Sequence, residues 1–282
     1  MSLGILTNVA ATYAENNLNQ TQGSLQKVLQ QLSSGSRINS GADDAAGLAV
    51  ADGLAANEAA LTQSAQNAQN GVGLLQTADG ALSQVTNLLN RAVTLATEAA
   101  NGTLTAGQVS SADAEYQNIL TEIGNIGSTT NFNSSAVFSA TATNFVVSDG
   151  TTAGTTTFAD TIGVLTTASI GTATGGGAGE DLSASTLTAA GAAAELAKIT
   201  TAIADVANQR GTIGANINQL NAAASVASSE QVNLSAAESS IRSTNYGQAT
   251  SDLAKFQVLS QTGISALAQA NSVQQEILKL LQ

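Results

Sequence analysis

A repeat of apolar side chains in the last third of the chain limits the possible folds more than any other feature of the sequence. From Leu196 to Ile241, alternating steps of three and four residues reach fourteen positions, and eleven of these are apolar. The repeat holds for over six heptads, and the sequence contains no proline that would force a helix to end. It predicts one long α-helix with an apolar stripe that packs against another helix.

Two segments earlier in the chain show the same spacing. The stripe of a predicted helix from Ala45 to Ala100 comprises Leu61, Ala65, Ala68, Val72, Leu75, Asp79, Leu82, Thr86, Leu89, Val93 and Ala96. Leu88 and Leu95 lie off this stripe, so we expect the helix to have apolar neighbours on a second side. The next stripe comprises Val109, Ala112, Tyr116, Ile119, Ile123 and Ile126. Thr105 and Gln108 predict a capping box at its start, and Gly127 is expected to end it.

Both ends of the chain are predicted to be thin helices that need partners. The N-terminal segment has Leu18, Leu25, Val28 and Leu32, and the C-terminal stripe has Phe256, Leu259, Gly263, Ala266, Ala270, Val273, Ile277 and Leu280. Two such helices bury little apolar surface, whereas each ordered residue costs about 1–2 kcal/mol of backbone entropy. We therefore expect them to order fully only when copies of the chain pack together. The residues expected to drive this polymerisation are Leu18, Leu25, Val28, Leu32, Phe256, Leu259, Ala266, Val273, Ile277 and Leu280.

The middle of the chain has a different composition. Ser, Thr and Gly supply 28 of the 55 residues from Ser128 to Leu182. Two strands, Asn144–Val147 and Thr155–Phe158, are predicted on either side of an Asp-Gly turn, followed by a flexible loop at Gly171–Asp181. The predicted fold is mainly α, a long antiparallel helical rod or coiled coil formed by both chain ends, with a small β-hairpin segment in the middle. The predicted domains are residues 1–43 with 243–282 (paired terminal helices), 44–140 with 190–242 (a helical rod), and 141–189 (hairpin and loop).

Charge and residue types exclude several classes of function. The net charge is −12, and the chain has no Lys or Arg between Arg91 and Lys198, so we expect neither nucleic acid nor an anionic membrane as a partner. The sequence has no Cys and no His, which removes thiol chemistry, the usual zinc ligands and the base of a Ser-His pair. We therefore expect a protein without catalytic residues, cofactor or metal.

The acidic residues are better explained by structure than by chemistry. Asp43 stands where the N-cap of the helix from Ala45 belongs, since carboxylates are favoured in a first helical turn. Asp149 and Asp160 flank the predicted turn and are expected to face solvent. Arg210 occupies a stripe position, where we expect it to extend to solvent or to pair with an acid.

Arg91 and Leu95 are spaced i, i+4 and lie off the stripe of their helix, so they are expected to be neighbours on an outer face. Glu115 and Glu122, seven residues apart, share a position beside the next stripe. A solvated face and a contact surface both fit these residues.

Several long stretches carry a resemblance to the bacterial flagellins. They are LSSGSRINSGADDAAGLAVADGL (32–54), NAQNGVGLLQTADGAL (67–82), NRAVTLATEAANGT (90–103), NLSAAESSIRSTNYGQATSDLAKFQVLSQTGISALAQAN (233–271) and the ending ILKLLQ. The chain resembles a short form of this family that lacks large outer domains. The resemblance implies a subunit that polymerises with many identical copies into the extracellular flagellar filament, with the paired terminal helices lining an inner tube.

The resemblance also implies partners. They are the flagellar export apparatus, a chaperone for the C-terminal helix, the filament cap and the hook-associated proteins. In the family, Toll-like receptor five contacts positions that match Arg91, Leu95 and Glu115 here, although Val93 and Thr94 replace the usual Arg and Glu. A hook–filament junction protein and a soluble secreted helical adhesin or signalling ligand stay open as alternatives.

Overall fold

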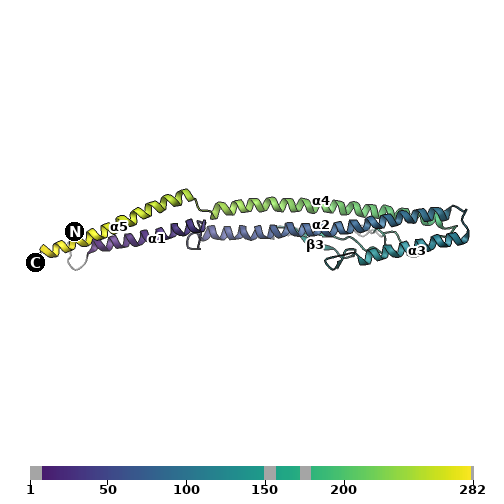
Figure 1. Ribbon diagram of the computed structural model, residues 1–282, viewed down its shortest axis with the longest axis horizontal. Helices are drawn as coiled ribbons and strands as arrows, with labels where there is room; N and C mark the ends of the chain where they lie inside the picture. The colour runs from purple at the N-terminus through teal and green to yellow at the C-terminus, as the bar shows by residue number, and fades with distance from the viewer. Residues whose placement is uncertain (1–7, 149–156, 172–178, 281–282) are drawn as a thin grey trace. The chain divides into compact units, whose positions relative to one another are not determined.

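The computed structural model describes residues 8–148, 157–171 and 179–280, without the side chains of 277–280. In this part of the chain the fold is mainly α, as predicted from the sequence (Figure 1). The helices are α1 (Val9–Ser34), α2 (Ala45–Ala100), α3 (Ala106–Thr129), α4 (Ala192–Arg242) and α5 (Tyr246–Leu280). The short strands are β1 (Asn131–Phe132), β2 (Ser135–Ala136), β3 (Thr143–Val146) and β4 (Thr157–Asp160). The chain divides into two compact units, one formed by Met1–Ala56 with Asn233–Gln282 and the other by Asn57–Val232.

In the first unit, the two terminal helices α1 and α5 run side by side in opposite directions (Figure 1). The side-chain amide of Asn8 donates a hydrogen bond to the carbonyl of Ala270 at 3.0 Å. At the other end of the pair, the hydroxyl of Thr244 donates to the carbonyl of Gln31 at 3.3 Å. The start of α1 therefore lies beside the last turns of α5, and the end of α1 lies beside the start of α5. This confirms the predicted antiparallel pairing of the chain ends.

In the second unit, α2, α3, α4 and the segment between α3 and α4 share one hydrophobic core. Leu75, Leu82 and Leu89 are fully buried along α2, and Ile199, Val206, Ile213 and Leu220 are buried at seven-residue steps along α4. Arg210 pairs with Asp79, with Nε of the arginine 2.7 Å from Oδ1 of the aspartate. The predicted pairing of Arg210 with an acid is confirmed, and both residues occupy stripe positions of their helices.

The stripe predicted for α2 consists of two rows of positions, each with a seven-residue step. The structure buries one of these rows as predicted, and the other is displaced by one residue. The predicted row through Leu61, Ala68 and Leu75 is buried, but Ala65, Val72, Thr86 and Val93 are only half-buried. The second buried row runs one residue earlier, through Ser64, Gly71, Ala78, Val85, Ala92 and Ala99. The reason is that α2 contacts both α4 and α3 in this unit, and α3 is the second apolar neighbour predicted from Leu88 and Leu95.

The start of α3 follows the prediction, whereas its end does not. The hydroxyl of Thr105 accepts from the amide of Gln108, whose side chain accepts from the amide of Thr105, so the capping box is present. Gly127 lies within α3, which continues to Thr129. A Cβ at Gly127 would overlap the carbonyl of Leu165, so this glycine allows the close approach of another segment instead of ending the helix.

Two antiparallel hairpins follow α3. β3 pairs with β4 from Thr143↔Asp160 to Val146↔Thr157, which shifts both predicted strands by one or two residues. The predicted turn and most of the predicted loop at Gly171–Asp181 lie outside the described residues, as does Asp149. The β1–β2 hairpin was not predicted, and its turn residues Asn133 and Ser134 have φ values of 49° and 64°. Asp160 does not face solvent, because its side chain is only 3% exposed at the end of β4.

Candidate functional site

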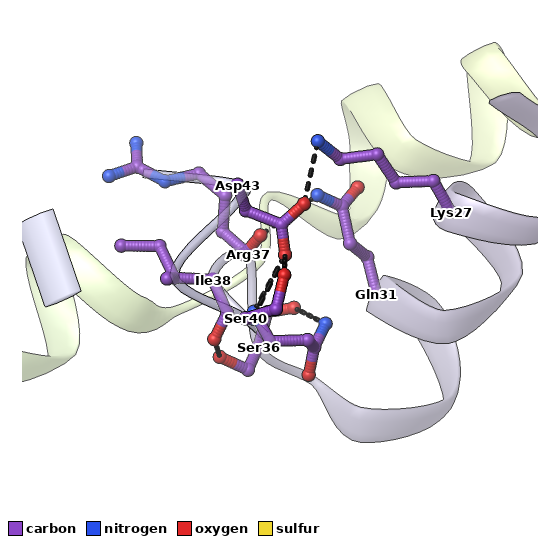
Figure 2. Close-up of polar contacts among 8 residues, drawn as sticks. Lys27, Gln31, Ser36, Arg37, Ile38, Ser40 and Asp43 are labelled. Carbon is purple, nitrogen blue, oxygen red and sulfur yellow. Dashed lines mark hydrogen bonds and ion pairs between the residues drawn. The ribbon is translucent and has the colours of Figure 1, made fainter. Parts of the chain in front are cut away.

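The connection between α1 and α2, residues 35–44, is a compact polar loop built around Asp43 (Figure 2). Its Oδ2 accepts hydrogen bonds from the backbone amides of Asn39 and Ser40, at 3.1 and 3.0 Å, and from the hydroxyl of Ser40 at 3.1 Å. Its Oδ1 lies 2.8 Å from Nζ of Lys27 on α1. The pKa of Asp43 is lowered from 3.8 to about 2. The largest cause is the hydrogen bond from Lys27, and the next is the hydrogen bond from the amide of Asn39.

Asp43 is therefore not the N-cap of α2. Oδ1 of the next residue, Asp44, accepts from the amide of Gly47 at 2.8 Å, and its backbone carbonyl accepts from the amide of Leu48. This is the geometry of an N-cap for a helix that begins at Ala45. Asp43 instead stabilises the loop, because a lysine on the preceding helix is within reach.

A second loop, residues 243–245 between α4 and α5, is fastened to the first. The amide of Arg37 donates to the carbonyl of Arg242 at 2.7 Å, and the amide of Thr244 donates to the carbonyl of Gly35 at 3.0 Å. The hydroxyl of Ser36 donates to the carbonyl of Ile38 at 2.8 Å. This junction was not predicted from the sequence, although the stretch from Ser33 to Ser40, rich in Ser and Asn, is typical of a hydrogen-bonded loop.

The residues predicted to drive polymerisation fall into two sets in the first unit. Leu18, Leu25, Val28 and Leu32 on α1 and Phe256 on α5 are buried or half-buried in the described chain. Leu259, Ala266 and Val273 on α5 are exposed, with 43% for Leu259 and 42% for Val273. The side chains of Ile277 and Leu280 lie outside the described residues.

Other large apolar side chains of α1 and α5 are exposed as well. Val9, Tyr13 and Leu29 of α1 and Val258 and Ile264 of α5 are also exposed apolar side chains. Soluble proteins seldom leave so many large apolar side chains exposed on two neighbouring helices. The geometry of this unit thus suits further apolar contacts.

The residues predicted as a receptor contact lie in the second unit. Arg91 on α2 and Glu115 on α3 form a bidentate ion pair, with Nε to Oε1 at 2.7 Å and Nη2 to Oε2 at 3.0 Å. The pair lowers the pKa of Glu115 and raises that of Arg91, and both side chains remain about half-exposed. Leu95 was expected on the same outer face, but it is 2% exposed and packs in the core because α3 covers that side of α2.

The acidic side chains of the described residues do not form a metal-binding cluster. No three Asp, Glu, His or Cys side chains gather there in a way that could hold a metal ion. The carboxylates of Asp43 and Asp44 are occupied by backbone amides and Lys27, as expected of residues that stabilise a loop and a helix end. Among the helices of the described ranges, none has the length and apolar character needed to cross a bilayer.

Comparison with known proteins gives a consistent result at both ends of the chain. Residues 5–143 match the family profile of the bacterial flagellin N-terminal helical region, and residues 196–281 match that of the bacterial flagellin C-terminal helical region. The flagellar filament 30.7 kDa core protein of Treponema maltophilum is 32% identical over 97% of this chain and 98% of its own length. The flagellin of Listeria innocua is 29% identical over 98% of both chains.

Two further similarities cover less of the sequence. Flagellin 1 of Proteus mirabilis is 40% identical over 54% of this chain, and the match spans 41% of that longer protein. The crystal structure of Bacillus cereus flagellin is 29% identical with a TM-score of 0.47, over 61% of this chain and 94% of that chain. The two family profiles together cover most of the sequence, one before the Ser/Thr/Gly-rich middle and one after it. The chain belongs to the bacterial flagellin family.

Proposed function

We propose that this protein is the structural subunit of a bacterial flagellar filament and polymerises with identical copies of itself. The observation that carries the proposal is the match of the flagellin profiles to both helical ends of the chain. The relative from Treponema maltophilum, named a filament core protein, supports it because the alignment spans almost the whole of both chains. The two alternatives, a junction protein and a soluble adhesin or signalling ligand, have no comparable support.

The proposed contacts between subunits lie on the α1–α5 pair. Burial of Leu18, Leu25, Val28, Leu32 and Phe256 supports a role in holding the two helices together. The exposure of Leu259, Ala266 and Val273 supports a role in contacts with other copies. Fully burying a Leu or Val side chain contributes roughly 1.5–3 kcal/mol, so covering the part of Leu259 or Val273 that is still exposed contributes less than this. A filament repeats each such contact over many subunits. Ile277 and Leu280 continue the same spacing and are proposed to act with this second group.

The division of the chain into domains follows from this function. We assign residues 1–43 and 243–282 to an inner domain, 44–140 and 190–242 to an outer helical domain, and 141–189 to a hairpin and loop segment. The junction of the two polar loops, which lies between the end of α1 and the start of α5, supports boundaries near 43 and 243. The two compact units divide about ten residues further into α2 and α4, at 56/57 and 232/233.

Electron microscopy of the purified protein at rising concentration tests the proposal. The parent chain should form long tubes, and deletion of Phe256–Gln282 should abolish them while the remaining chain stays helical by circular dichroism. A double variant, Leu259→Ser with Val273→Ser, should also fail to polymerise. Gln261→Ser, at an exposed polar position of the same helix, is the matched control and should form tubes. Absence of tubes for the parent under every condition would overturn the proposal.

The filament function brings further partners and a location as proposals. We assign the protein to the cell exterior, reached through the flagellar export apparatus, with a chaperone on the C-terminal helix before export. The filament cap and the hook-associated proteins are the proposed neighbours at the two ends of the filament. Fractionation of cells with and without a working export apparatus tests the location, since the protein should leave the cell only when the apparatus is intact.

Recognition by Toll-like receptor five is proposed through Arg91 and Glu115 alone. Both side chains are about half-exposed, which supports direct contact, whereas the buried Leu95 can act only by supporting the helix surface. Arg91→Ala should weaken receptor signalling while leaving polymerisation intact. An equal response to the variant and the parent would remove this surface from consideration.

A further inference from the structure

The chain contains two Asn-Gly pairs, Asn70-Gly71 and Asn101-Gly102, and the structure places them in opposite surroundings. An asparagine followed by glycine can react with its own backbone, because the next amide nitrogen and the side-chain carbonyl carbon are the two ends of a potential five-membered ring. Glycine favours this closure, since it has no Cβ to obstruct the approach and adopts many backbone conformations. The backbone around each pair therefore decides whether the ring can close.

Asn101 and Gly102 lie in the exposed connection between α2 and α3. α2 ends at Ala100 and α3 begins at Ala106, and the side chains or backbone of Asn101, Gly102 and Thr103 are exposed. Gly102 has a φ of 60°, outside the helical range, and no atom lies within 4 Å of the position that a Cβ would take. Within the described ranges, no carbonyl accepts a hydrogen bond from the amide of Gly102. Its nitrogen is therefore accessible to the neighbouring side chain.

Asn70 and Gly71 lie inside α2, where the same closure is blocked. Gly71 is buried, and its amide belongs to the hydrogen-bond ladder of the helix. A Cβ at Gly71 would lie 2.9 Å from Cδ1 of Leu220, so α4 closely covers the backbone at this point. Ring closure would require α2 to open locally, and a helix in the core of a unit does so rarely. The two pairs thus share their chemistry and differ in access.

We propose that Asn101 is a site of spontaneous deamidation in the folded protein, through a succinimide formed with the backbone nitrogen of Gly102. This nitrogen loses its proton and bonds to Cγ of Asn101, and the bond from Cγ to Nδ2 breaks so that ammonia leaves. Water then adds to one of the two carbonyl carbons of the ring and reopens it. Breaking the bond from nitrogen to Cγ gives aspartate, and breaking the bond from nitrogen to the backbone carbonyl carbon gives isoaspartate.

The reaction changes the connection between α2 and α3 in two ways. It adds a carboxylate one residue after the end of α2, where the helix dipole is negative. The carbonyl of Glu98 already accepts the amide of Asn101 there at 3.1 Å, so the new charge lies in the same turn as an acidic residue. The isoaspartyl product also inserts one carbon into the backbone. The site lies outside the residues assigned to polymerisation and to the receptor, and the proposal does not depend on the filament function.

Peptide mapping by mass spectrometry, after incubation of the folded full chain in a mildly alkaline buffer, tests the proposal. The peptide with Asn101 should gain the mass difference between an amide and an acid, and it should separate into aspartyl and isoaspartyl forms. In water enriched in a heavy oxygen isotope, both forms should carry the label. The peptide with Asn70 is the internal control, and it should convert at least about tenfold more slowly because its reaction needs local opening of α2.

Two variants and one change of conditions separate the proposed route from others. Asn101→Gln keeps the amide but lengthens the side chain, so the favourable ring is lost and conversion at this position should fall below detection. Asn70→Gln is the matched variant and should leave conversion at Asn101 unchanged. In urea that unfolds the chain, Asn70 and Asn101 should convert at similar rates. Equal rates in the folded protein, unequal rates in urea, or an aspartyl product without the isoaspartyl form would each overturn the proposal.

Discussion

The glycines of α3 offer a sharp test of how the second unit is packed. Gly124 and Gly127 are three residues apart in one helix, and both become better helix formers when replaced by alanine, by about 0.8–1 kcal/mol. Their surroundings differ. A Cβ at Gly124 would meet only Cγ2 of Thr167 at 3.8 Å, an ordinary contact. A Cβ at Gly127 would lie 2.8 Å from the carbonyl carbon of Leu165 and overlap its oxygen.

These surroundings set the size and sign of each effect. Gly124→Ala is expected to stabilise the protein by a little under 1 kcal/mol, because nothing opposes its gain in helix propensity. Gly127→Ala forces a backbone group to move, and overpacking of this kind typically costs about 1–3 kcal/mol. Its gain in propensity is also smaller in the last turn of the helix. The net effect at Gly127 is therefore expected to be a loss of about 1–2 kcal/mol.

Thermal unfolding followed by circular dichroism, at a concentration where the protein is monomeric, measures both variants. One kcal/mol corresponds to roughly 2–4 °C in a chain of 150–250 residues, so the midpoints should move in opposite directions by a measurable amount. A crystal structure of Gly127→Ala should show the backbone displaced at Leu165. Equal increases in the midpoint for the two variants would refute the close packing of this segment on α3.

Substitutions at three acidic residues should change the stability of the protein in predictable ways. Asp44→Ala removes the N-cap of α2 and should cost about 0.5–2 kcal/mol in urea unfolding, whereas no loss would assign the cap to another group. The pKa of Asp43 is lowered to about 2, mainly by Lys27, so its ionised form stabilises the fold above about pH 4 and this contribution is lost as the pH falls toward 2. Asp43→Asn should flatten the stability profile in that window, and an unchanged slope would contradict the assignment. Burial raises the pKa of Asp160, so its contribution is fully present only below about pH 4 and is lost as the pH rises through the folded-state pKa. Asp160→Asn should be more stable than the parent at neutral pH, and a less stable variant would show that the carboxylate has a partner.

The helices could be predicted from the sequence because their signals are local. The bounds of α2 at Ala45 and Ala100 and the capping box of α3 follow from spacing and from residues within one turn of each helix end. The roles of Asp43 and Asp44 could not be separated in this way, since adjacent carboxylates satisfy the same preference. The structure separates them, because Lys27 on α1 and the amides of Asn39 and Ser40 hold Asp43 in the loop. Asp44 is then the carboxylate that caps the helix.

The exposed and buried residues of α5 were also beyond local reasoning. Phe256 and Leu259 are both apolar and three residues apart, and both belong to the same predicted stripe. A helix paired with a single neighbour can bury only part of such a stripe. Gly263, where a Cβ would lie 3.3 Å from Cδ1 of Leu18, belongs to the part that faces α1. The predicted stripe therefore identifies the apolar surface of α5, but it does not show which of its residues contact α1 and which remain available to other copies.

The displaced row of α2 has a different cause, because its buried residues carry little apolar signal. Gly71 and Ala78 are small, and Ser64 is polar, so hydropathy ranks Val72 and Val93 above them. Burial at this row depends on how closely the backbones approach. A Cβ at Gly71 would lie 2.9 Å from Cδ1 of Leu220, so the absence of a side chain there lets α4 come near α2. Small residues in a long helix without proline therefore need to be counted together with the large apolar ones, since on α2 the row through Leu75 and the row through Gly71 and Ala78 are both buried.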